Sequence, residues 1–186
     1  MGWMKDETGL EKRPANYVPL TPLSHLRRAR EVFAKRAAVI YGPHRVTYAE
    51  YHARCSQLAS ALSESGIIPG DVVATLLPNI PAQAEAHFGV PACGAVLNTI
   101  NTRLDVDTVA YIFEHGEAKV ALVDPQFLDL AEAAIERMES DGPRIIEVAD
   151  DHAGFPASGR YETYEDVLAS AAVSYTHLTL PTNTVT

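Results

Sequence analysis

Short runs of apolar residues alternate along the chain with segments in which apolar residues recur at helical spacing. Continuous apolar runs predict strands that are buried on both faces of a sheet. These runs are Val72–Leu77, Ala95–Leu97, Val120–Val123 and Arg144–Val148. Asn79 and Asp105 are expected to cap the helices that follow the first two runs, and a third helix covers Leu128–Met138. The alternation predicts the α/β fold class, with a mostly parallel sheet and right-handed crossovers.

The residues before the first buried run predict two helices and a hairpin. Apolar spacing favours an amphipathic helix over Pro22–Lys35. The runs Ala38–Tyr41 and Val46–Thr47 are separated by a Gly-Pro turn, which is typical of a hairpin. Thr47 and Glu50 have the spacing of a capping box, so we expect a second helix to begin there.

Size and composition indicate an ordinary globular protein. The chain has 186 residues, which suits one domain or a piece of a larger one. Its formal charge is −9, so we expect no nucleic-acid partner. We expect no secretory signal and no transmembrane segment, because no apolar run is long enough. Cys55 and Cys93 fit two reduced thiols, and we expect a cytoplasmic location.

Common motifs for nucleotide and hydrolytic chemistry do not occur in the sequence. It contains no dinucleotide-binding glycine pattern, no GxxxxGK[ST] loop, no GxSxG elbow and no HExxH pattern. His87 is interpreted as a core residue of an apolar helix, and His115 as a residue at a helix end. Glu114 and His115 are not expected to form an acid–base pair, because adjacent helical residues point apart.

The polar segment Asn98–Arg103 follows a predicted buried strand, where open α/β sheets place their binding loops. Its Asn and Thr side chains can satisfy backbone groups in Asx- and ST-type turns. A loop held by its own hydrogen bonds is therefore the favoured interpretation, and a loop that contacts a ligand is the alternative.

The end of the chain differs in composition from the rest. Residues 149–160 have loop character, and Tyr161–Ala169 can form a short helix. The last segment, 173–186, has five threonines and no charge, and its SYTHLTLPT core resembles a translated library-adapter sequence. We therefore expect a flexible N-terminal arm over residues 1–18, a domain over residues 19–172 and a non-native tail over residues 173–186. A genuine Thr-rich tail is the alternative.

Four blocks of the sequence resemble the N-terminal part of the AMP-forming acyl-CoA synthetases, which are adenylate-forming ligases. The blocks are LTPLSHLRRAREVFAKRAAVIYG, RVTYAEYHARCSQLASAL, GDVVATLLPNIPAQAEAHFGVPACGAVLNTINTRLD and YIFEHGEAKVALVD. Their order and spacing agree with the family over about Leu20–Leu168, and the resemblance is closest to the fatty-acyl-CoA ligase branch. It implies an incomplete N-terminal subdomain of the adenylate-forming fold.

The resemblance also implies the reaction of the whole protein. A carboxylic acid, expected to be a fatty acid, attacks the α-phosphate of ATP to give acyl-AMP, and coenzyme A then takes the acyl group. ATP, Mg²⁺ and coenzyme A are implied for the whole protein, with a homodimer as a candidate assembly.

The family's active-site segments have no counterpart in this sequence. These are the Ser/Thr/Gly-rich loop that ends in Lys-Gly, the aromatic-Thr-Glu segment, the ribose-binding Asp and the lid lysine. We therefore assign no catalytic, cofactor-binding or metal-binding residue. We expect the chain alone to be inactive and to bind none of these cofactors.

Two other interpretations stay open. A stand-alone α/β module that binds a small ligand or a protein would also lack these motifs, but it needs a closed sheet that the Thr-rich end does not supply. An aryl-CoA ligase or a luciferase-like oxidoreductase shares the scaffold. By resemblance, the block GVPACGAVLNTINTRL favours the fatty-acyl branch.

Overall fold

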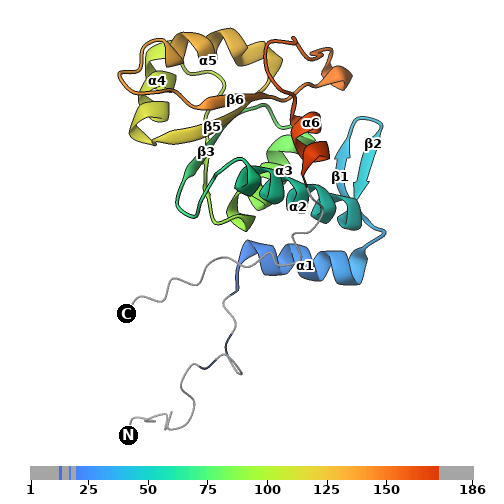
Figure 1. Ribbon diagram of the computed structural model, residues 1–186. Helices are drawn as coiled ribbons and strands as arrows, with labels where there is room; N and C mark the ends of the chain where they lie inside the picture. The colour runs from blue at the N-terminus through green and yellow to red at the C-terminus, as the bar shows by residue number, and fades with distance from the viewer. Residues whose placement is uncertain (1–12, 14–16, 18–19, 172–186) are drawn as a thin grey trace, which may run out of the picture.

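Helices and strands alternate in the order that the sequence predicts (Figure 1). The structure, a computed structural model, describes residues 13, 17 and 20–171. The predicted tail over residues 173–186 lies outside the described residues, as does the predicted arm except for Arg13 and Tyr17. The division into arm, domain and tail therefore stays a prediction.

The N-terminal part consists of two helices that flank a hairpin. Its elements are α1 (Pro22–Phe33), β1 (Ala37–Tyr41), β2 (His44–Thr47) and α2 (Tyr48–Glu64). The two strands pair antiparallel, as predicted. The predicted capping box is confirmed, because the Thr47 side chain accepts from Glu50 N while Glu50 accepts from Thr47 N. Each bond satisfies a backbone donor at the start of α2.

The predicted parallel sheet forms within the described residues and has four strands in the order β4-β3-β5-β6. The strands are β3 (Val72–Leu76), β4 (Val96–Thr99), β5 (Ala118–Val123) and β6 (Arg144–Glu147). All neighbouring pairs among them run parallel. The α/β fold class is therefore confirmed.

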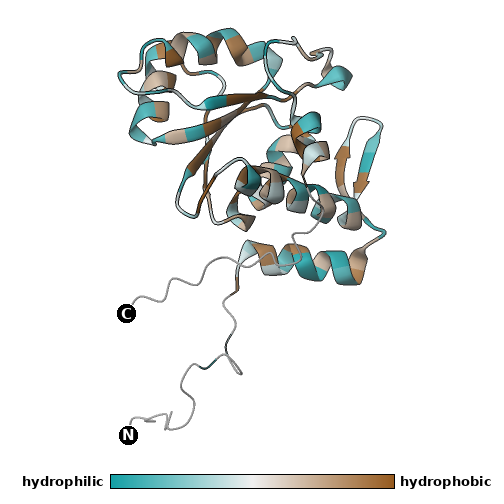
Figure 2. Ribbon diagram, viewed as in Figure 1, coloured by the Kyte–Doolittle hydropathy of each residue, from teal (hydrophilic) through white to brown (hydrophobic). Residues whose placement is uncertain are grey.

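Helices cover both faces of this sheet (Figure 1). The helices are α3 (Pro81–Ala92), α4 (Val106–His115), α5 (Leu128–Ile135) and α6 (Tyr164–Ser170), and short 3₁₀ turns occupy Pro125–Phe127 and Asp151–Ala153. Adjacent strand residues point to opposite faces, so Ile146 packs in the core beneath α2, α3 and α6, while Ile145 packs beneath α4 and α5. The strands are accordingly hydrophobic over much of their length, with hydrophilic segments in β5 and β6 (Figure 2).

Two local predictions are wrong. Asn79 does not cap α3, because Ile80 is the N-cap residue and no side chain caps this end. The apolar run at Ala95–Leu97 does not form a strand buried on both faces. It lies instead at β4, which is the edge strand of the described sheet, and Val96 is 51% exposed. An apolar run does not reveal whether a second neighbouring strand is present.

Across the described residues, no helix combines the length and the apolar character that crossing a membrane requires.

Candidate functional site at the carboxyl edge of the sheet

The chain changes direction across the sheet between β3 and β5. From β3 it continues to β4 on one side, and from β5 it continues to β6 on the other side. In open parallel sheets, ligands bind beyond the carboxyl ends of the strands near such a reversal. A cleft and a second hollow lie at this edge of the described structure, and together they form the candidate site.

The cleft has a volume of about 560 Å³ and lies beyond the ends of β3 and β4. It is lined by Thr75, Leu77, Pro78, Asn79, Gln83, His87, Thr99, Ile100, Asn101 and Thr102. These residues come from β3, the start of α3 and the segment after β4, so the alternation of strands and helices brings them together. Seven of these residues carry hydroxyl, amide or imidazole groups and three are apolar, so the cleft is more polar than most small-molecule sites.

Two polar atoms of the cleft residues are buried without a hydrogen-bond partner among the described residues. They are Oγ1 of Thr75, a residue that is only 1% exposed, and Oε1 of Gln83. A buried polar atom left in this state costs about 1–3 kcal/mol. The end of α3 that begins at Pro81 also has no side-chain cap. The cleft therefore offers hydrogen-bonding groups to a polar ligand or to another segment of polypeptide.

The polar segment Asn98–Arg103 is held in part by its own side chains. Asn101 Oδ1 accepts a hydrogen bond from Arg103 N over 3.0 Å, which is the Asx-type turn that the sequence favours. Thr99, Asn101 and Thr102 also line the cleft. The structural interpretation is confirmed for Asn101, while contact with a ligand stays a prediction.

The prediction that His87 is a core residue is wrong. His87 is exposed on α3 and lines the cleft, with Nδ1 2.7 Å from Gln83 O. Ala82, Ala86 and Val90 form the buried stripe of this helix. At 100° per residue, His87 is rotated away from that stripe although its neighbours in sequence are apolar. Helical spacing is therefore a better guide at this position than local composition.

The structure bears out the interpretations of His115 and Glu114. His115 lies in the last turn of α4, where its ring stacks on Tyr111 with the centroids 5.2 Å apart. Glu114 Oε1 accepts from the backbone N–H groups of Glu139 and Ser140 over 3.0 and 3.2 Å. Glu114 thus fixes the segment after α5, which is a structural role.

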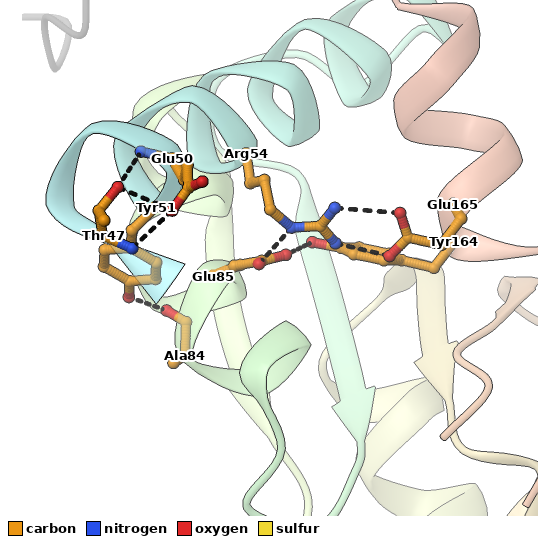
Figure 3. Close-up of polar contacts among 8 residues, drawn as sticks. All are labelled: Thr47, Glu50, Tyr51, Arg54, Ala84, Glu85, Tyr164 and Glu165. Atoms are coloured by element: carbon orange, nitrogen blue, oxygen red, sulfur yellow. Dashed lines mark hydrogen bonds and ion pairs between the residues drawn. The ribbon is translucent and has the colours of Figure 1, made fainter. Parts of the chain in front are cut away.

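Sequence reasoning missed a partly buried network of ion pairs and hydrogen bonds that joins three helices (Figure 3). Arg54 Nε of α2 donates to Glu85 Oε1 of α3 over 2.5 Å, and Tyr164 OH of α6 donates to Glu85 Oε2 over 2.8 Å. Arg54 also donates to both carboxylate oxygens of Glu165, over 2.6 and 3.0 Å. Glu85 is 1% exposed, and both of its oxygens are bonded. The sequence did contain a signal for a buried charge, because Glu85 falls on the apolar stripe of α3.

The second hollow, of about 490 Å³, lies between β6, α6 and the hairpin. Tyr41 OH closes one side of it by donating to Asp150 Oδ2 over 2.5 Å. This hydrogen bond raises the pKa of Tyr41 to about 12. The ring of His152 packs edge-on against Tyr41, with the centroids 5.1 Å apart. The loop after β6 thus holds the hairpin in place.

Buried carboxylates at the ends of β5 and β6 serve local structure. Glu147 accepts from the N–H and hydroxyl of Ser158 over 2.5 and 3.0 Å. Asp124 accepts from Gln126 N over 2.9 Å, and burial raises the pKa of Asp124. Within the described ranges, no group of three His, Cys, Asp or Glu side chains is placed to hold a metal ion. Both cysteines are buried and free of disulfides, as expected.

A parallel sheet covered on both faces, with a cleft at its carboxyl edge, defines a doubly wound α/β domain. The family described as AMP-binding enzyme matches residues 26–177, and the chain belongs to this family. The resemblance drawn from the four sequence blocks is therefore confirmed.

The relatives include CoA ligases of two plants. The chain is 44% identical over 184 residues to "Acetate/butyrate--CoA ligase AAE7, peroxisomal" of Arabidopsis thaliana, covering 92% of this chain and 32% of that protein. It is 50% identical over 131 residues to "Trans-cinnamate:CoA ligase, peroxisomal" of Petunia hybrida, covering 70% and 23%. The chain thus spans about a third or less of the length of these relatives.

A solved benzoate CoA ligase from Burkholderia xenovorans LB400 shares the fold. Its TM-score is 0.69 at 23% identity, and the match covers 81% of this chain and 28% of that one. The described sheet and helices therefore correspond to part of an adenylate-forming fold.

Proposed function

We propose that this chain forms the amino-terminal part of an AMP-forming ligase that joins a carboxylic acid to coenzyme A. One observation carries the proposal, which is the family match over residues 26–177. The 44% identity to the acetate/butyrate–CoA ligase AAE7 supports it. In the first half-reaction a carboxylate oxygen bonds to the α-phosphorus of ATP, and pyrophosphate leaves. In the second, the coenzyme A thiolate bonds to the acyl carbon, and AMP leaves.

The proposed substrate class is a short aliphatic carboxylic acid. This proposal is narrower than the expectation from the sequence, which is a fatty acid of any chain length. The name of AAE7 supports it, whereas the cinnamate ligase supports an aryl acid as the second candidate. ATP, Mg²⁺ and coenzyme A are proposed for the whole protein. No group of three or more His, Cys, Asp or Glu side chains among the described residues could hold a metal ion, and no step of the reaction is assigned to a metal contact with them. A cytoplasmic location stays a prediction, since both relatives are named as peroxisomal.

The part played by this chain is to build the sheet and the cleft wall beside which the reaction occurs. Thr75, His87 and Asn101 line the cleft at the edge where α/β sheets bind their ligands. The Arg54–Glu165 ion pair holds α6 against α2, and the Tyr41–Asp150 hydrogen bond holds the hairpin beside that edge. Rigid placement of such elements is what binding and catalysis require from a scaffold.

A chimera tests the proposal. Residues 20–171 replace the matching part of AAE7, and butyrate-dependent AMP formation is measured with ATP and coenzyme A. We expect activity within about tenfold of unmodified AAE7, because a scaffold with the same packing preserves the geometry of the site. AAE7 without its amino-terminal part is the matched control. A folded chimera that forms no AMP would contradict the proposal.

A further inference from the structure

Positive charge is concentrated in α1 and in the hairpin that follows it. Residues 20–47 hold six of the 15 Lys and Arg residues of the chain and one of its 24 Asp and Glu residues, Glu31. Six positive and one negative side chain give this segment a formal charge of +5, whereas the whole chain has a charge of −9. The two signs are thus separated along the chain, and a surface of one sign attracts partners of the other.

The cations of this segment are exposed and have no carboxylate partner among the described residues. They are Arg27, Arg28, Arg30, Lys35, Arg36 and Arg45. The ion pairs of the described structure include none of them. Four arginines elsewhere in the chain do form ion pairs, namely Arg54, Arg137, Arg144 and Arg160. The charges of residues 20–47 are therefore not used to hold the fold together by ion pairing.

The outer face of α1 displays part of this charge. Figure 1 shows α1 at the edge of the molecule, with α2 on one side of it. Leu23 and Leu26 are the buried residues of the helix. Arg28 is rotated by about 200° from Leu26, and Val32 follows Arg28 after about one turn. Since Val32 is 56% exposed, this face presents an aliphatic side chain beside an unpaired cation.

Helix stability accounts for only some of these cations. A positive side chain in the last turn of a helix interacts favourably with the helix dipole, which explains Arg30. Arg27 and Arg28 lie in the middle of α1, where the dipole gives no such benefit. Glu31 is three to four residues away from them, yet it forms no ion pair with either within the described structure. Their charges are thus available to an anionic partner.

We propose that the outer face of α1 docks this protein on the surface of an anionic lipid bilayer. Exposed aliphatic side chains favour a bilayer over a soluble polyanion, because lipid phosphates lie directly beside apolar chains. Leu20, just before α1, is 85% exposed, and Val32 lies on the outer face itself. The acidic remainder of the chain is repelled by the same lipids, which gives the docked protein one orientation. Docking of this kind is peripheral and requires no helix that spans the membrane.

Sedimentation of the 186-residue chain with vesicles tests the docking. Vesicles of phosphatidylcholine alone are compared with vesicles that contain about 30 mol% phosphatidylglycerol. At low ionic strength we expect partitioning onto the anionic vesicles to be at least about tenfold stronger, with release at about 0.5 M salt, because salt screens exposed charges. Equal partitioning onto both kinds of vesicle, or none onto either, would overturn the proposal.

Variants that remove charge locate the contact. Arg28→Gln combined with Lys35→Gln removes two exposed, unpaired cations from α1 and the residues just after it. We expect partitioning to fall by about fivefold for each cation removed. Arg103→Gln combined with Lys119→Gln is the matched control, since it removes two exposed cations elsewhere that form no ion pair among the described residues. Equal losses in the two double variants would contradict a specific role for α1, and equal Tm values show that both variants are folded.

Two further measurements distinguish the bilayer from other occupants of this surface. If inorganic phosphate releases the chain from vesicles more effectively than chloride at the same ionic strength, the surface binds free anions and the proposal is wrong. If the chain self-associates without vesicles and Arg28→Gln with Lys35→Gln abolishes this, a second copy is the partner, which also contradicts the proposal. The activity of the AAE7 chimera is measured separately, so docking and the proposed function can fail independently. We expect neither release by phosphate nor self-association.

Discussion

Nε of Arg54 lies 2.5 Å from Oε1 of Glu85, although the two residues are 31 positions apart on α2 and α3. Glu85 is 1% exposed, while the Arg54 side chain is 29% exposed, so the carboxylate is buried and the guanidinium group is partly accessible to water. Such a pair adds little net stability to the folded state, because burying a charge is costly. Removing one partner lowers the free energy of unfolding strongly, since it leaves the other charge buried without its counterion. Arg54 is therefore a structural residue, and its ion pair with Glu165 also holds α6 against α2.

The first prediction concerns this ion pair. Arg54→Met should lower the free energy of unfolding by about 2–4 kcal/mol, because Glu85 is left as a buried carboxylate without its cation. Arg137→Met is the matched control. Its partner is Asp107, both side chains are more than half exposed, and the loss should stay below about 1 kcal/mol. Urea unfolding monitored by circular dichroism measures both values. Equal losses of unfolding free energy in the two variants would show that the Arg54–Glu85 pair contributes no more to stability than an exposed ion pair.

The second prediction concerns pH and Tyr41. Its hydrogen bond to Asp150 raises the Tyr41 pKa from 10.0 to about 12. Since the folded-state pKa is raised, the stability from this contact is fully present below pH 10 and is lost as the pH rises through about 12. The difference in unfolding free energy between the natural chain and Tyr41→Phe should therefore be constant up to about pH 10 and shrink above it. A difference that stays constant from about pH 9 to about pH 12 would contradict this assignment.

The third prediction concerns Gly89, which lies in α3 where that helix crosses α2. A Cβ at this position would meet Leu58 Cδ2 at 2.7 Å and Cys55 O at 3.0 Å. Gly→Ala usually stabilises a helix by about 0.8–1 kcal/mol. Here we expect Gly89→Ala to destabilise by about 1–3 kcal/mol, because the two helices must separate.

Thermal and urea unfolding measure this effect, and Leu58→Ala provides the control background. In that background Leu58 Cδ2 is removed, whereas the Cβ atom of residue 58 at 2.9 Å and Cys55 O at 3.0 Å remain, so the added cost of Gly89→Ala should fall only in part. A stabilising Gly89→Ala in the natural background would show that the helices are packed less closely than the structure indicates.

The fourth prediction concerns the two thiols. Cys55 and Cys93 are buried, and burial raises the pKa of both. A thiol with a raised pKa carries little thiolate near neutral pH, and the thiolate is the reactive form. Alkylation at about pH 8 should be at least about 100-fold slower in the folded chain than in urea, since reaction requires opening of the fold. Rapid alkylation of either residue in the folded chain would contradict the packing of α2 against α3.

The sequence predicts the frame of this fold because its signals are local. The capping box at Thr47 and Glu50 and the apolar runs of the strands each depend on a few neighbouring residues. The Asx-type turn at Asn101 is of the same kind, since donor and acceptor lie two residues apart. Local chemistry of this sort can be recognised without knowing the tertiary contacts.

The candidate site depends on contacts that local patterns do not contain. Arg54 and Glu165 are 111 positions apart, and Tyr41 and Asp150 are 109 apart. The edge position of β4 depends on which strands lie beside it, and the composition of VLNT does not report that. Asn79 has a typical capping side chain, yet the helix begins one residue later, after Ile80. Pairing over long separations is set by the assembled fold and therefore escapes local sequence patterns.

The most direct test of the central claim is an assay of the protein encoded by the source gene. The reading frame is sequenced beyond the codon of Ala171, and its complete product is assayed for acid-dependent exchange between pyrophosphate and ATP. Acetate, butyrate, cinnamate and benzoate are compared, with the 186-residue chain as the control. We predict butyrate-dependent exchange by the longer product and none by the chain alone. A frame that ends at Thr186, or a longer folded product that exchanges with none of the four acids, would contradict the account.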